Sequence, residues 1–87
     1  MSRFVHIGYG NIVNSDKITA IVNPDAAPVK RMVQTAKENG TAIDATQGRK
    51  TKAVLVMTEG QIVLSALLPD TIAARAQEQD KNGGMNG

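Results

Sequence analysis

An unbroken apolar run over residues 53–57 constrains the fold of this chain most strongly. A strand with one solvated face alternates apolar and polar side chains, whereas a continuous apolar run indicates cover on both faces. We therefore predict a strand over residues 51–57, with other elements packed against each of its faces.

Strand character recurs elsewhere, and glycine, asparagine and proline mark the turns between the segments. In residues 3–7 the side chains alternate, which places Val5 and Ile7 on the face opposite Phe4. Residues 58–60 have the composition of a hairpin connection to the strand that follows. The further strands predicted are residues 3–7, 12–13, 18–22, 41–45 and 61–68.

Two segments have the pattern of a helix. In residues 28–39 apolar residues recur at helical spacing, Pro28 suits the first turn and Gly40 suits the C-cap. A shorter helix is predicted from Asp70 to about Gln77, because an acidic residue is favourable at the positive end of a helix. Residues 78–87 are polar and glycine-rich, and we expect a disordered tail there.

The order of these elements predicts an α+β fold, a small, mostly antiparallel sheet with one main helix and a short C-terminal helix. We expect residues 1–77 to form a single domain. The only aromatic residues are Phe4 and Tyr9, so the core must be aliphatic, and we expect one of these two to be buried. In 87 residues without cysteine such a core is marginal, so self-association is the expected supplement.

Several classes of function are disfavoured by what the sequence lacks. There is no cysteine and His6 is the single histidine, so we expect no metal site and no cofactor. Ser2, Ser15 and Ser65 have only His6 as an available base, which argues against an enzyme. No apolar segment has the length of a signal peptide or a membrane span, so we expect a cytoplasmic protein without membrane contact.

The turn at residues 8–11, Gly-Tyr-Gly-Asn, contains a Gly-x-Gly pattern. A dinucleotide-binding loop would add a third glycine and lead directly into a helix, but Val13 stands at that position and the segment is β-branched. A tight turn with positive φ angles is the better interpretation. A small-molecule sensor that uses this turn is the weaker alternative, and we expect no small-molecule substrate.

Basic residues concentrate in residues 28–52, which hold six lysines and arginines against two acidic residues. Three of the six follow Gly48 at the start of the predicted strand: Arg49, Lys50 and Lys52. Such loop cations suit phosphate. They equally suit a strand end that opposes aggregation, and the residues alone leave both interpretations open. Lys17 would share their end of the sheet if the strands at residues 18 and 51 ran the same way.

If this loop binds a nucleic acid, duplex DNA is the expected partner. Proteins that bind single strands or RNA generally stack bases on aromatic side chains, and this chain has only two. Contact with the phosphates of a double helix fits an aliphatic chain with a basic segment better.

Five blocks of sequence together resemble the RemA-type (YlzA) bacterial regulators of the extracellular matrix. The resemblance extends from about residue 4 to about residue 74, nearly all of the predicted domain. The blocks are residues 7–12 (IGYGNI), 21–24 (IVNP), 27–32 (APVKRM), 43–46 (IDAT) and 48–53 (GRKTKA).

The resemblance implies a transcription regulator, linked to activation of biofilm-matrix genes and to osmotic adaptation. It further implies a ring-shaped homo-oligomer that carries duplex DNA on a basic rim, with contacts from Lys17, Arg49 and Lys50. Two of these are lysines where better-known members have arginine. Lysine keeps the charge but lacks the bidentate fork, so we expect phosphate affinity rather than base readout. With Lys52 they form the predicted DNA-binding set; the alternative is a structural ring without a nucleic-acid function.

Overall fold

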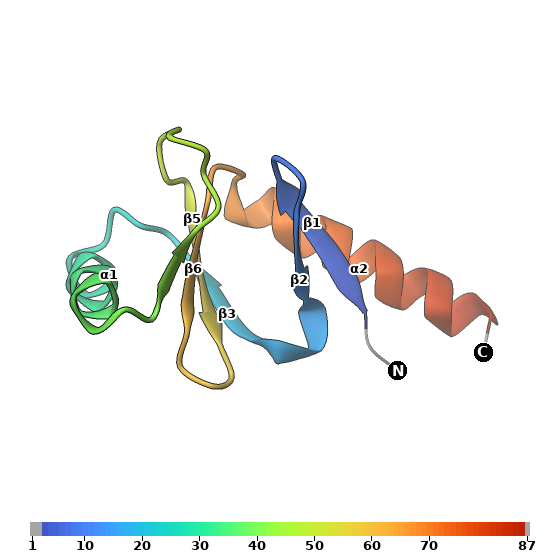
Figure 1. Ribbon diagram of the computed structural model, residues 1–87. Coiled ribbons are helices and arrows are strands. Elements are labelled where there is room, and N and C mark those ends of the chain that lie inside the picture. The colour runs from blue at the N-terminus through green and yellow to red at the C-terminus, as the bar shows by residue number, and fades with distance from the viewer. Residues whose placement is uncertain (1–2, 87) are drawn as a thin grey trace.

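The computed structural model describes residues 3–86, and their side chains as far as residue 77. In chain order the elements are β1 (Phe4–Gly8), β2 (Asn11–Asn14), the 3₁₀ turn η1 (Ser15–Lys17), β3 (Ile18–Val22), α1 (Ala27–Asn39), β4 (Ala42–Asp44), β5 (Ala53–Met57), β6 (Ile62–Ser65) and α2 (Pro69–Asn86). A central sheet lies between α1 on one face and the β1–β2 hairpin with α2 on the other (Figure 1). The predicted α+β fold is confirmed.

The central sheet has the strand order β3-β5-β6-β4, and β1 pairs with β2 in a separate antiparallel sheet. β5 is antiparallel to both of its neighbours, whereas the short β4 runs parallel to β6. Because β4 and β6 point the same way, the connection from β4 to β5 passes over the end of β6. This connection, residues 45–52, holds the three clustered cations and is called the basic loop below.

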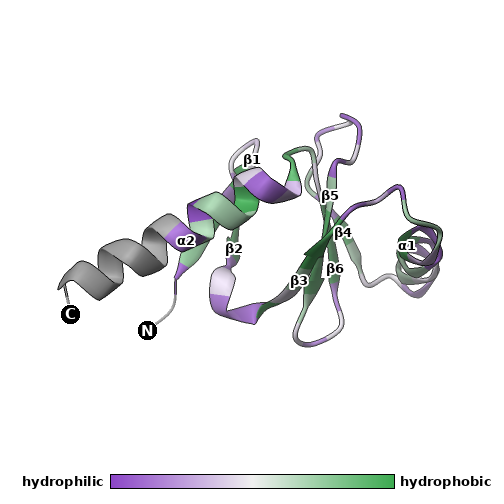
Figure 2. Ribbon diagram, turned by 180° about the vertical axis from the view of Figure 1, so that it is seen from behind, coloured by the Kyte–Doolittle hydropathy of each residue, from purple (hydrophilic) through white to green (hydrophobic). Residues whose placement is uncertain are grey.

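The apolar run in β5 is covered on both faces, as predicted. Val54 packs with Ala36 of α1, while Leu55 belongs to a second cluster with Val5 and Ile72 from the other side of the sheet. Neither Val54 nor Leu55 keeps any exposed surface (0% each). Figure 2 shows hydrophobic residues concentrated in β5 and β6, with the basic loop hydrophilic above them. Burial of a side chain of this kind contributes roughly 1.5–3 kcal/mol.

Both predicted helices are present. α1 begins with a proline in its first turn and is capped by Gly40, whose left-handed φ of 74° lets its N–H reach the last turn of the helix. α2 begins at Pro69 with Asp70 in its first turn, and its bounds extend past the predicted end near Gln77 to Asn86. A disordered tail over residues 78–87 stays a prediction, because the side chains from residue 78 onward and residue 87 itself lie outside the described part.

The expectation that one aromatic side chain is buried is wrong. Phe4 and Tyr9 are 49% and 50% exposed. The alternation in β1 turns Val5 and Ile7 inward and Phe4 outward, and Tyr9 stands on the turn that follows β1. The buried clusters of the described residues are therefore aliphatic throughout.

Candidate nucleic-acid interface

The antiparallel pairing of β3 with β5 divides the predicted DNA-binding residues into two sets. Lys17 directly precedes β3, and its carbonyl accepts hydrogen bonds from the backbone N–H (2.7 Å) and the hydroxyl (2.9 Å) of Thr58, just beyond the end of β5. Arg49 and its neighbours precede the start of β5, at the other end of that strand. The strands run in opposite directions, so Lys17 and Arg49 do not share one end of the sheet (Figure 1).

The basic loop has a hydrogen-bonded backbone. Asp44, where the loop begins, accepts the N–H (2.9 Å) and the hydroxyl (2.6 Å) of the buried Thr46. The Thr46 carbonyl in turn accepts the N–H of Arg49 at 3.0 Å, which closes a turn. At the far end, the N–H of Lys52 donates to the Ser65 carbonyl at 2.8 Å. The cations therefore project from a base that is fixed at both of its ends.

Two residues in this turn have left-handed backbones, Gln47 with a φ of 54° and Gly48 with a φ of 77°. The hydroxyl and backbone hydrogen bonds from Thr46 lower the pKa of the Asp44 carboxyl, and the positive charge of Lys37 acts in the same direction. The charged form of Asp44 is thus the one that fits the loop.

The cations of the basic loop are accessible to a partner. Arg49, Lys50 and Lys52 are all exposed. Lys50 and Lys52 also line a hollow of about 240 Å³ together with the turn after β3 and the start of α2. Asp25 lines the same hollow, so an anionic group that entered it would meet two ammonium groups and one carboxylate.

The turn at residues 8–11 lies against the basic loop. The guanidinium carbon of Arg49 is 5.7 Å from the centroid of the Tyr9 ring, and the side-chain amide of Asn11 donates to the Ala45 carbonyl at 3.4 Å. The φ angles of residues 8–10 are all positive, as a tight turn requires, and a strand follows rather than a helix. Sequence reasoning did not connect this turn to the cations; the available signal was an aromatic residue between two glycines.

Lys17, the fourth predicted residue, has different surroundings. It is exposed, and it lines a second hollow of about 240 Å³ with the carboxylate-bearing Glu59 and the apolar residues Val13, Met57 and Val63. An acidic residue in the same hollow offsets part of the charge there. The structure therefore brings together Arg49, Lys50 and Lys52, and leaves Lys17 apart from them.

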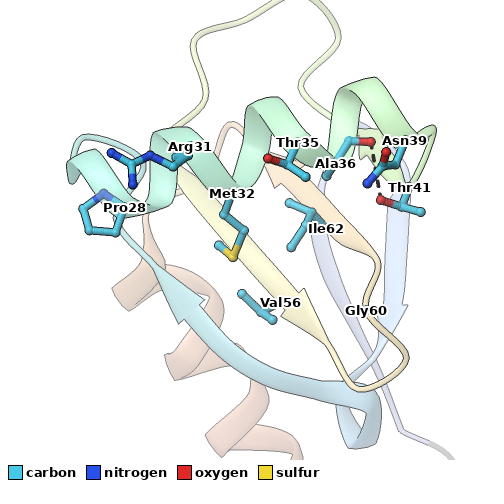
Figure 3. Close-up of a pocket in the computed structure, with 10 residues that line it drawn as sticks. All are labelled: Pro28, Arg31, Met32, Thr35, Ala36, Asn39, Thr41, Val56, Gly60 and Ile62. Atoms are coloured by element: carbon cyan, nitrogen blue, oxygen red, sulfur yellow. Dashed lines mark hydrogen bonds between the residues drawn. The ribbon is translucent and has the colours of Figure 1, made fainter.

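A larger hollow of about 550 Å³ runs between α1 and the sheet (Figure 3). Met32, Val56 and Ile62 point toward one another in it, and Arg31 is the single charged residue that lines it. It is also lined by the polar residues Thr35, Asn39 and Thr41. Among the described residues there is no group of three histidines or acidic residues placed to hold a metal ion, and no helix is long and apolar enough to cross a membrane.

The family model that matches this chain and several of its relatives are described as regulatory proteins. Residues 4–76 match a family model described as RemA-like, extracellular matrix regulatory protein A-like. A candidate regulatory protein of Lachnoclostridium phytofermentans is 59% identical over 80 residues, which cover 92% of this chain and 88% of the relative. Candidate regulatory proteins of Bacillus cereus and Bacillus cytotoxicus are 53% and 54% identical, with 91% and 90% of both chains covered in each case.

Proposed function

The chain belongs to the RemA-like family of extracellular matrix regulatory proteins, and we propose that it regulates transcription by binding duplex DNA as a ring-shaped homo-oligomer. In this proposal it acts in the cytoplasm as an activator of genes for the extracellular matrix and for osmotic adaptation. The residues that contact DNA are Lys17, Arg49, Lys50 and Lys52.

The basic loop is the observation that carries this proposal. Three exposed cations lie within four residues, on a backbone whose hydrogen bonds tie it to β6 at Leu64 and Ser65. Arginine and lysine form charge-assisted hydrogen bonds with phosphate oxygens. Because the base of the loop is already ordered, binding loses less conformational freedom than it would with the same cations on a flexible segment.

Repetition of the loop in an oligomer supplies the affinity that one copy lacks. Three phosphate contacts would give a slope of only about −2.7 in log affinity against log salt, at roughly −0.9 for each phosphate. Several loops on one particle bind the same duplex at a high effective concentration, which multiplies their separate contributions. Apolar residues are also available for contact between copies, since Ile12, Ile43 and Leu68 are 50%, 54% and 56% exposed.

The separation of Lys17 from the basic loop limits how one protomer can bind. The five residues of β5 extend over about 17 Å. A single phosphate therefore cannot contact both Lys17 and Arg49 of the same protomer. In the ring we propose, Lys17 contacts other phosphates and adds to the total affinity without completing the site at the basic loop.

A salt titration of duplex binding, combined with native mass measurement, tests the proposal. We expect a closed oligomer whose affinity for random-sequence duplex DNA falls steeply with salt, and a shallower slope for Arg49→Ala and for Lys50→Ala. Arg31→Ala, which removes an exposed cation from α1 that shares a hollow with Gly60 and not with the basic loop, is the matched control and should bind like the wild type.

Three results would each overturn a different part of the proposal. If only single protomers are found in dilute buffer, the ring-shaped oligomer is overturned. If intact rings do not shift duplex DNA at low salt, the DNA-binding role is overturned and the structural ring is favoured instead. Unchanged affinity in Arg49→Ala, Lys50→Ala and Lys17→Ala would overturn the assignment of the site.

A further inference from the structure

The turn at residues 8–11 is the part of the molecule that the proposed function leaves unexplained. Its aromatic ring lies beneath a cation of the basic loop, with 5.7 Å between the Arg49 guanidinium carbon and the Tyr9 ring centroid. This distance is within the range of a cation–π contact, which extends to about 6 Å. Both residues are exposed, so the contact is on the surface that faces the proposed partner.

The backbone at Tyr9 is unusual for this side chain. Gly8, Tyr9 and Gly10 have consecutive φ angles of 105°, 54° and 78°, all in the region that glycine adopts readily. A bulky residue with a positive φ is uncommon and carries a steric cost. A residue held in such a conformation suggests a use for its side chain, and in this turn the side chain meets Arg49.

Two further contacts fix the turn relative to the sheet and to the basic loop. The amide nitrogen of Asn11 donates to the Gly8 carbonyl within the turn (3.0 Å) and to the Ala45 carbonyl at the base of the basic loop (3.4 Å). A Cβ atom at Gly8 would lie 3.4 Å from the side chain of Leu67, so the backbone there packs closely on the segment before α2. The aromatic ring of Tyr9 is therefore held next to Arg49 by a turn that is itself fixed to the sheet and to the basic loop.

We infer that Tyr9 is a positioning residue for DNA binding, which holds the Arg49 guanidinium ready for a phosphate. This inference rests on the proposed function and adds the turn at residues 8–11 to its site. An arginine on a loop loses side-chain freedom when it binds, and the ring face reduces that loss by restricting the cation beforehand. Attraction to a ring face does not consume the N–H donors of the guanidinium, which stay available for phosphate oxygens.

Substitution of Tyr9 in the full-length oligomer tests this role. Tyr9→Asn removes the ring and suits the left-handed backbone, because asparagine tolerates a positive φ. We expect its affinity for random duplex DNA to fall by about three- to tenfold, the effect of one weak contact repeated over several subunits. Tyr9→Phe keeps a ring face and should restore most of the affinity. Phe4→Leu, which removes the other half-exposed aromatic of the same hairpin, should bind like the wild type.

A double-mutant cycle separates positioning from a general structural effect. In an Arg49→Ala background, Tyr9→Asn should cause no further loss of affinity, because the group that the ring positions is already absent. A structural defect would instead lower the affinity equally in both backgrounds, and would overturn the inference. Thermal unfolding of Tyr9→Asn should match the wild type, and if this variant does not fold, the ¹⁹F comparison of the wild type with Arg49→Ala, described next, decides the question.

The single tyrosine also gives a direct probe of the contact. Because the chain has one tyrosine and no tryptophan, incorporation of 3-fluorotyrosine labels Tyr9 alone. Its ¹⁹F signal should shift when duplex DNA is added and when Arg49 is replaced by alanine, and Arg49→Ala should abolish the shift with DNA. Replacing Tyr9 with phenylalanine removes the signal, which confirms the assignment, while its DNA affinity shows whether a ring face suffices.

The outcomes distinguish this inference from the proposed function. If the wild-type oligomer does not bind duplex DNA, the proposed function fails and this role fails with it. If the wild type binds but Tyr9→Asn binds equally well, or if the ¹⁹F signal is insensitive to DNA and to Arg49→Ala, the positioning role is overturned and the proposed function stands.

Discussion

The two ends of the central sheet both carry cations, but in different settings. At the end where β5 begins, Arg49, Lys50 and Lys52 project from a loop whose backbone is hydrogen-bonded at both ends, and an aromatic ring lies against one of them. At the end where β5 finishes, Lys17 shares a hollow with Glu59. Because Asp25 also lines the hollow with Lys50 and Lys52, the two ends differ in the number and grouping of their cations, which makes the basic loop the better candidate ligand for a polyanion.

The largest effect is expected from removing charge at the basic loop. Arg49→Ala combined with Lys50→Ala should lower the affinity for duplex DNA by roughly 100-fold or more at moderate salt, because up to two phosphate contacts are lost in every engaged subunit. The slope of log affinity against log salt should become shallower in the same gel-shift titration. Wild-type affinity in this double variant would show that the two ends do not differ as we describe.

A smaller effect is expected from the other end. Lys17→Ala should lower the affinity by about three- to tenfold, since one cation per subunit is lost and Glu59 already offsets part of its charge. Fluorescence anisotropy with a labelled duplex gives the ratio of the two losses directly. A loss for Lys17→Ala equal to that of the double variant at the basic loop would remove the distinction between the ends.

Two glycines allow the same backbone change to be made at each end of the central sheet. Gly48 in the basic loop and Gly60 in the β5–β6 turn have φ angles of 77° and 95°, and a Cβ atom added at either position would meet no atom within 4 Å. Alanine at either position should lower the free energy of unfolding by about 1 kcal/mol through backbone strain alone. Only Gly48→Ala should also weaken DNA binding, by a few-fold, because it disturbs the loop backbone from which the cations project. Chemical denaturation and a binding titration on both variants check this pair.

The smallest expected effect is on the stability of the protein at acidic pH. Hydrogen bonds from Thr46 lower the pKa of Asp44 in the folded protein, so the charged carboxylate stabilises the loop at neutral pH. This contribution is complete above the ordinary pKa of an aspartate and is lost as the pH falls from that value through the lowered one. The thermal midpoint of the wild type should therefore decrease more over this window than that of Asp44→Asn. Thr46→Val, which removes the hydroxyl donor, should reduce the difference; equal acid dependence in all three proteins would contradict this role of Asp44.

Local patterns in the sequence predicted most of the elements. The apolar run of β5 indicated cover on two faces, and proline and glycine marked the ends of α1, because these signals depend on residues a few positions apart. The aliphatic core followed from the scarcity of aromatic residues. The burial of one aromatic was wrongly predicted, because strand alternation and a surface turn placed Phe4 and Tyr9 outside despite their hydrophobic area.

By itself, the sequence determined most of the secondary structure, the aliphatic core, the family and the cluster of cations after Gly48. Only the tertiary structure decided how these parts meet. The direction of β3 relative to β5 set Lys17 apart from Arg49, and the packing of the β1–β2 hairpin on the central sheet brought Tyr9 to Arg49 from 40 positions earlier in the chain. Such placements depend on pairing between distant segments, which no short stretch of sequence specifies alone.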